Sequence, residues 1–170
     1  MKKGIYLASH NAILNYDNII YQDINGTRDI GGCMLDVDLK NYDFIIATPP
    51  CNYYSRANYR RETSLYSQKT KHLLPNIIDK LIDLGKPFIV ENVRNFNLFK
   101  KLGLFKKGCF VYFHGRHTYW SNIMIDFTFI PQKNDNVQNI AQADRQGGDN
   151  VNNVINYWVE YIFANNLFEI

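Results

Sequence analysis

The sequence predicts an α/β fold with a mostly parallel, doubly wound sheet, and two observations lead to that prediction. Short apolar runs, several of them nearly continuous, recur along the chain, as expected for strands buried on both faces of a parallel sheet. A segment with helical apolar spacing lies between two of these runs, which is the pattern of a strand–helix–strand unit. No repeat or shift in composition divides the 170 residues, so we expect one domain over residues 1–170.

The apolar runs place five strands along the chain. Three of these runs are nearly continuous, as expected for strands that are buried on both faces of a parallel sheet. The predicted strands are Ile5–Leu7, Asn18–Tyr21, Asp43–Ala47, Pro87–Val90 and Cys109–Phe113.

Two helices follow from apolar stripes. The clearer one lies between the third and fourth strands; Gly85 and Pro87 end it, and Pro75 can either open its first turn or kink it. The polar, amide-rich stretch 132–150 predicts a long loop, and the apolar spacing after it predicts a helix over Val151–Ala164. The stripe of the first helix consists of Leu73, Leu74, Ile77, Ile78, Leu81 and Ile82.

Composition narrows the class of protein. A net charge of +3 and a pI of about 8.7 are compatible with a polyanionic partner. No stretch approaches the roughly 18 apolar residues of a membrane span, so we expect no membrane association. The three cysteines form no CxxC pair, which favours a reduced, cytoplasmic protein without a metal site. His114 and His117 are interpreted as polar loop residues rather than metal ligands.

The most informative segment is the one that follows the third strand, with the sequence "TPPCNYYS". Pro49 and Pro50 fix an extended path, so Cys51 is presented at a defined position beyond the carboxyl end of a buried strand. Cys51 is therefore either a structural cysteine in an ordinary turn or a nucleophile.

A carboxylate at the end of the next strand favours the second interpretation. Glu91 follows the apolar run "FIV", where burial of its charge without a role is costly. The carboxyl ends of neighbouring parallel strands lie roughly 5 Å apart, so Cys51 and Glu91 would face one pocket.

These two segments resemble the cytosine-5 DNA methyltransferase family, in which a Pro-Cys loop and a Glu-Asn-Val strand end occur in this order; here they read "TPPCNYYS" and "VENV". The resemblance implies a Rossmann-like class I methyltransferase fold and the cofactor S-adenosylmethionine. It also implies that Cys51 attacks C6 of cytosine, that Glu91 acts at N3, and that Asn92 holds the loop or the base edge. The partner would be DNA, either duplex with a flipped cytosine or single-stranded.

The resemblance extends to further segments. "HGRHTYWSN" is similar to the motif in which an arginine assists the base, which would be Arg116. "QGGDNVNNV" is similar to the C-terminal segment that packs beside the cofactor. The cofactor-binding residues implied in this way are Leu7, Ala8, Ser9, Asp23, Ile24, Asp36, Pro49, Asn150 and Val151.

The nucleic-acid contacts are expected from the segment that follows Cys51. Arginines there alternate with Tyr53, Tyr54 and Tyr59, and arginine suits phosphates while tyrosine can stack on bases. The lysines between residues 100 and 107 are interpreted as a solvated surface. The predicted nucleic-acid-binding residues are Asn52, Ser55, Arg56, Arg60 and Arg61.

Two departures from the family keep alternatives open. No glycine follows Leu7, where the family has a glycine-rich turn for the cofactor, and few residues after Val93 are left for a target-recognition domain. The favoured hypothesis is a minimal DNA methyltransferase; its composition fits a phage origin, and thus the cytoplasm of a bacterial host. The alternatives are an enzyme that modifies cytosine in RNA or nucleotides, and a non-catalytic relative that binds nucleic acid or a protein.

Overall fold

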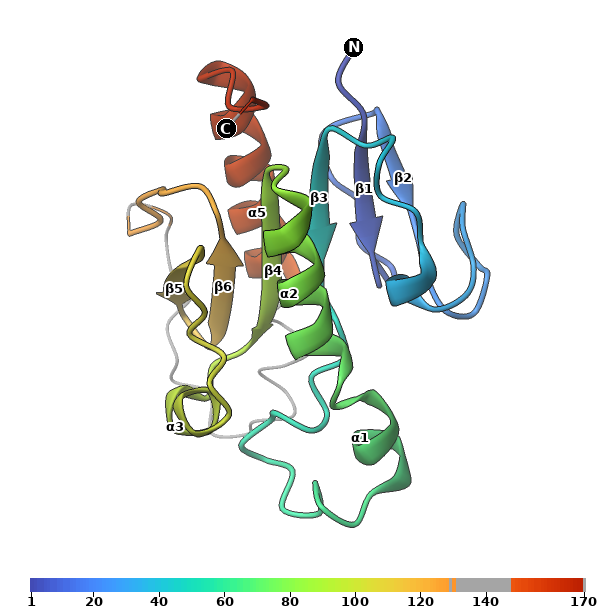
Figure 1. Ribbon diagram of the computed structural model, residues 1–170, viewed down its shortest axis with the longest axis vertical. Coiled ribbons are helices and arrows are strands. Elements are labelled where there is room, and N and C mark those ends of the chain that lie inside the picture. Colours follow the sequence, from blue (N-terminus) through green and yellow to red (C-terminus); the bar gives the residue numbers. More distant parts are fainter. Residues whose placement is uncertain (129, 131–147, 170) are drawn as a thin grey trace.

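Six strands form one sheet in the order β2-β1-β3-β4-β6-β5 (Figure 1). The computed structural model describes residues 1–128, 130 and 148–169, so most of the predicted loop at 132–150 lies outside the described residues. The strands are β1 (Gly4–Leu7), β2 (Ile19–Tyr21), β3 (Phe44–Ala47), β4 (Phe88–Val93), β5 (Phe110–His114) and β6 (His117–Ser121).

The α/β class is confirmed, but the sheet is mixed rather than mostly parallel. β2, β1, β3 and β4 pair in parallel, whereas β6 pairs antiparallel with both β4 and β5. The physical reason is the short connection between β5 and β6, where only Gly115 and Arg116 intervene. So short a turn can join only antiparallel strands, since a parallel pair needs a long crossover.

Helices cover both faces of the sheet, as Figure 1 shows for α2 (Leu73–Leu84) and α5 (Gly148–Ala164). Each predicted helix is present, and α5 begins three residues before the expected Val151. One core cluster joins α2 to one face of the strands, and the other joins α5 to the opposite face. The remaining short helices are η1 (Met34–Asp36), α1 (Leu65–Thr70) and α3 (Phe96–Lys101).

The ends of α2 follow from its sequence. Leu74, Ile77, Ile78 and Leu81 are fully buried, which confirms the apolar stripe. Pro75 lies in the first turn, where its missing N–H costs no helical hydrogen bond. Gly85 ends the helix in the left-handed conformation at φ 72°, which glycine adopts without the strain that a Cβ introduces.

The hairpin corrects a second expectation, because His114 and His117 lie in strands and not in loops. His114 is buried at the end of β5, and its Nε2 lies 2.9 Å from the Ile130 carbonyl oxygen. His117 begins β6 opposite Val93 of β4. The antiparallel pairing therefore carries His117 to the carboxyl end of β4, beside Glu91.

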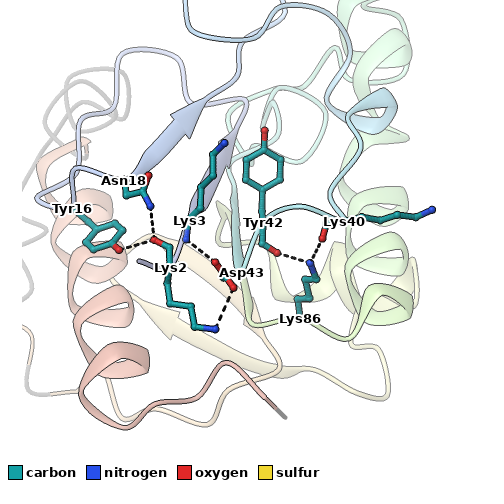
Figure 2. Close-up of polar contacts among 8 residues, drawn as sticks. All are labelled: Lys2, Lys3, Tyr16, Asn18, Lys40, Tyr42, Asp43 and Lys86. Atoms are coloured by element: carbon teal, nitrogen blue, oxygen red, sulfur yellow. Dashed lines mark hydrogen bonds and ion pairs between the residues drawn. The ribbon is translucent and has the colours of Figure 1, made fainter.

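A polar network fixes the amino-terminal edge of the parallel strands (Figure 2). The Asp43 carboxylate accepts hydrogen bonds from the Lys3 backbone N–H at 2.7 Å and from Lys2 Nζ at 3.3 Å. The bond from the Lys3 amide is the main cause of the lowered pKa of Asp43, with help from the Lys2 ammonium group. Lys86 Nζ donates to the carbonyl oxygens of Lys40 and Tyr42, which joins the start of β4 to the loop before β3.

We expect the substitution Gly4→Ala to destabilise the sheet. A Cβ at Gly4 would lie 2.3 Å from Cζ of Phe44, whose ring is fully buried and cannot move aside. Such overpacking costs about 1–3 kcal/mol, which urea unfolding would measure. In a Phe44→Leu background the same substitution should cost less, since the clashing ring is gone. Equal costs in the two backgrounds would contradict the proposed clash.

Within the described part of the chain, no helix has the length and apolar character that a membrane crossing needs.

Candidate active site

A cavity of about 700 Å³ lies at the carboxyl ends of the parallel strands. Its walls include the segments that follow β1, β2 and β3 and the second half of β4. Side chains from β6 and α5 also line it. This is the sheet edge at which open α/β folds bind ligands. The predicted site residues that line it are Ala8, Asp23, Ile24, Pro49, Cys51, Asn52, Glu91 and Val151.

The remaining predicted residues lie elsewhere. Leu7, Ser9 and Asn92 are buried beside the cavity without being among its lining residues. Asp36 is exposed in η1. Ser55, Arg56, Arg60, Arg61 and Arg116 are also not among the lining residues. Asn150 belongs to the first turn of α5, but its side chain lies outside the described part of the structure.

The loop that carries Cys51 is held by side-chain amides from the end of β4 and the residues that follow it. The buried Asn92 donates from Nδ2 to the Pro49 carbonyl oxygen at 2.9 Å, and Asn95 donates from Nδ2 to the Tyr54 carbonyl oxygen at 2.7 Å. The carbonyl oxygen of Cys51 accepts hydrogen bonds from the N–H groups of Tyr54 and Ser55. The loop is therefore fixed on both sides of Cys51. Cys51 itself is exposed and lines the cavity.

Glu91 reaches the same cavity from β4 and is paired with a histidine. His117 Nδ1 lies 2.6 Å from Glu91 Oε1, and the two side chains are 19% and 12% exposed. Tyr6 and Tyr119 are buried nearby; burial chiefly, and the Glu91 charge in addition, raise the pKa of each phenol. Both phenols therefore remain neutral at physiological pH.

The turn after β1 adopts positive backbone φ angles, which are typical of glycine, although it contains no glycine. Ala8 and His10 adopt φ angles of 51° and 49°, in the left-handed region that side chains disfavour. Gln22 holds the turn, because its side-chain oxygen accepts the Ala8 N–H at 2.8 Å and its backbone oxygen accepts the Ser9 N–H at 2.9 Å. The strain is thus offset by hydrogen bonds, and two amides of the turn are already satisfied within the protein.

The residues present fit the nucleoside half of a cofactor better than its amino-acid half. Asp23 follows β2, is only 8% exposed and lines the cavity, and the Thr27 hydroxyl donates a long hydrogen bond of 3.5 Å to its Oδ2. A buried carboxylate so weakly bonded calls for donors from a ligand. The turn at Ala8, in contrast, uses its Ala8 and Ser9 amides internally.

The arginine-rich loop is only partly available to a ligand. Arg56, Arg60 and Tyr59 are exposed, whereas Arg61 donates to the carbonyl oxygens of Ser55 and Asn58 and so braces the loop. Tyr53 and Tyr54 are 8% and 1% exposed within the core, which rules out the expected stacking of these two rings on bases.

Sequence reasoning missed several residues of the site. Gln22, Thr48 and His117 line the cavity, and Asn95 anchors the loop that carries Cys51. A polar residue at the end of an apolar run was a usable signal for Gln22, which directly precedes Asp23. Among the described residues, no group of three or more histidine, cysteine, aspartate or glutamate side chains could hold a metal ion.

Comparison with models of protein families gives a match. The family model described as C-5 cytosine-specific DNA methylase matches residues 6–109, which is more than half of the chain. The matched range includes both the loop around Cys51 and the end of β4 with Glu91, and it stops before β5. No curated protein matches the chain.

Proposed function

The chain belongs to the C-5 cytosine-specific DNA methylase family, and from this premise we propose that it transfers a methyl group from S-adenosylmethionine to C5 of cytosine in DNA. One observation carries the proposal. Cys51 and Glu91 come from the ends of neighbouring parallel strands and line the same cavity of about 700 Å³. A nucleophile and an acid in one cavity form an arrangement suited to chemistry rather than to packing.

In the proposed reaction the Cys51 sulfur bonds to C6 of the cytosine, while Glu91 supplies a proton or a hydrogen bond to N3. The electron pair of the C5–C6 double bond would then make C5 nucleophilic, and C5 would take the methyl group of S-adenosylmethionine, with S-adenosylhomocysteine as the leaving group. A base removes the proton from C5, the double bond re-forms, and the bond between Cys51 and C6 breaks. Asn92 keeps Pro49, and with it the loop of Cys51, attached to β4 throughout.

The cofactor would lie beside this pair in the same cavity. Asp23 would accept hydrogen bonds from ribose hydroxyls, and Ile24, Pro49 and Val151 offer apolar contacts along the wall. When bound, S-adenosylmethionine supplies an electrophilic methyl group. The Rossmann-like character that the family implies agrees with a ligand at the carboxyl ends of the parallel strands.

The substitution Asp23→Asn should weaken S-adenosylmethionine binding by about tenfold or more, because charge-assisted hydrogen bonds contribute roughly 1.5–3 kcal/mol. Isothermal titration calorimetry would measure the dissociation constant. Asp83→Asn is the matched control, since Asp83 is exposed on α2 and is not among the cavity-lining residues. Equal binding by wild type and Asp23→Asn would contradict the role of Asp23.

DNA would approach over the exposed arginines of the loop that follows Cys51. A cytosine in a duplex cannot reach the cavity unless it is flipped out, at a cost of a few kcal/mol, so single-stranded DNA is also a substrate to test. Arg56 and Arg60 are the exposed cations of this loop and would contact phosphates.

The double substitution of Arg56 and Arg60 by glutamine should weaken DNA binding and flatten its salt dependence. Each lost phosphate contact lowers the slope of log K against log salt by about 0.7–0.9. Fluorescence anisotropy at several salt concentrations would measure it. A double substitution of Lys3 and Lys40, near the other end of the strands (Figure 2), is the charge-matched control. Equal slopes for the two double variants would show that the DNA path lies elsewhere.

The proposed function is tested directly by its product. The protein is incubated with S-adenosylmethionine and random-sequence pools of duplex DNA, single-stranded DNA and RNA, and the hydrolysed nucleosides are analysed by mass spectrometry. We expect 5-methylcytosine in a DNA pool. Product in the RNA pool alone would reassign the substrate.

A second candidate rests on the turn after β1. Gln22 accepts hydrogen bonds from the Ala8 and Ser9 amides, so these amides are not available to a cofactor. The alternative function is therefore that of a non-catalytic relative that binds nucleic acid. Absence of 5-methylcytosine from every pool, together with DNA binding, would favour it.

A further inference from the structure

The pairing of Glu91 with His117 is a property of the tertiary structure that the proposed reaction has not yet used. The two residues lie on neighbouring antiparallel strands, and both line the cavity that contains Cys51. His117 Nδ1 and Glu91 Oε1 lie 2.6 Å apart, which is within hydrogen-bond distance. Arg116, the neighbour of His117 in the sequence, is not among the lining residues.

We propose that His117 is the positioning residue and proton partner of Glu91, so that the acid acting on cytosine is the Glu91–His117 pair and not Glu91 alone. This inference rests on the proposed function and assigns a residue to its acid step. The contact with His117 fixes one carboxyl oxygen and leaves Oε2 for the base. Because β4 and β6 pair directly here, with Val93 opposite His117, the Glu91 and His117 side chains project from adjacent strands on the same face of the sheet.

The proton balance of the step can be stated. Before reaction His117 Nδ1–H donates a hydrogen bond to Glu91 Oε1, and Oε2 of the Glu91 carboxyl group holds the proton that N3 will take. As the Cys51 thiolate bonds to C6, N3 of the cytosine takes that proton from Oε2, and the carboxylate left behind is stabilised by the His117 Nδ1–H. When the base of the proposed reaction removes the C5 proton and the bond to Cys51 breaks, N3 returns its proton to Glu91. The pair therefore ends the cycle as it began.

The proposal makes the reaction sensitive to pH, because a pair that has lost its proton has none to lend to N3. Tyr6 and Tyr119, which face this point, stay neutral. The other ionisable side chains line the cavity and are His10, Asp23, Cys33, Cys51 and Tyr66. Ionisation of Cys51 acts in the opposite direction, since the thiolate is the nucleophile, so the rate should pass through a maximum.

Four proteins test the proposal: wild type, His117→Ala, His117→Arg and the control His72→Ala, which removes an exposed histidine at the start of α2. We expect His117→Ala to lower kcat by at least about tenfold and to change KM by less than about threefold, the signature of a lost acid-step contribution. His117→Arg should recover most of kcat, since arginine also donates an N–H to Glu91 Oε1.

Either of two kinetic outcomes would overturn the proposal. One is a kcat for His117→Ala that equals the value for His72→Ala. The other is a kcat for His117→Arg that is no higher than the value for His117→Ala.

A readout that needs no activity separates this inference from the proposed function. The Nδ1–H proton of His117 should give a downfield NMR signal in the wild type, assigned by its absence in His117→Ala. In Glu91→Gln this signal should move upfield, because the carboxylate partner is gone. An unchanged signal would refute the pairing whether or not the protein forms 5-methylcytosine.

Discussion

DNA that carries 5-fluorocytosine should trap the protein covalently at Cys51 when S-adenosylmethionine is present. The expected adduct survives denaturing electrophoresis, and peptide mass analysis places it on Cys51. The reason is that the intermediate breaks down only after C5 loses its substituent as a cation, which hydrogen can do and fluorine cannot. The effect is all or none, because no alternative route releases the enzyme once C5 carries both fluorine and a methyl group.

The chain supplies its own controls for this experiment. Cys51→Ser should give no adduct, because a hydroxyl group is a far weaker nucleophile than a thiol at neutral pH. Cys33 also lines the cavity, so a Cys33→Ser variant that still forms the adduct would show that the reaction is specific to Cys51. Cys109 is half-buried and away from the cavity lining, and burial raises its pKa to about 11, so it should remain unmodified.

The result that would sink the covalent mechanism is equally definite. If S-adenosylmethionine binds and neither duplex nor single-stranded 5-fluorocytosine DNA nor the corresponding RNA yields an adduct, Cys51 is not the nucleophile. The fixed loop around Cys51 would then have a structural purpose, and the non-catalytic alternative would lead.

Glu91→Gln should lower turnover by at least about a hundredfold while it leaves the fold intact. Glutamine has nearly the volume of glutamate, but it cannot provide the proton that N3 requires, and loss of a general acid typically costs about 10²–10⁴ in rate. The measurement is the rate of 5-methylcytosine formation at saturating cofactor, with thermal unfolding as the check on the fold. The cavity position of Glu91 and its bond to His117 are the structural grounds for this effect.

Glu62→Gln is the matched control for this prediction. Glu62 is an exposed acid of the neighbouring loop, where it accepts a hydrogen bond from the Tyr53 hydroxyl, and it is not among the cavity-lining residues. The Glu62→Gln substitution removes the same charge as Glu91→Gln at a site outside the cavity lining. It should keep turnover within about threefold of wild type. A Glu91→Gln variant as active as Glu62→Gln would remove Glu91 from the mechanism.

The sequence by itself determined the central part of the fold and the identity of the candidate reacting groups. Buried strands such as β3 are readable because they are continuous apolar runs, and α2 is readable because its stripe repeats at helical spacing. The approach of Cys51 to Glu91 followed from one further rule, since the carboxyl ends of adjacent parallel strands meet at the same sheet edge. These features depend on local pattern and on general geometry.

Only the tertiary structure decided what surrounds those groups. His117 stands 26 positions from Glu91 in the chain and reaches it through the antiparallel pairing of β6 with β4, which no local pattern encodes. Tyr53 and Tyr54 look like ligand-stacking residues in the sequence, yet the turn at Cys51 points them into the core. Gln22 stabilises the glycine-free turn for the same reason, because strand register brings its side-chain amide oxygen to the Ala8 N–H. Pairing and register are set by the burial of the whole sheet, so contacts across strands are fixed only when the chain has folded.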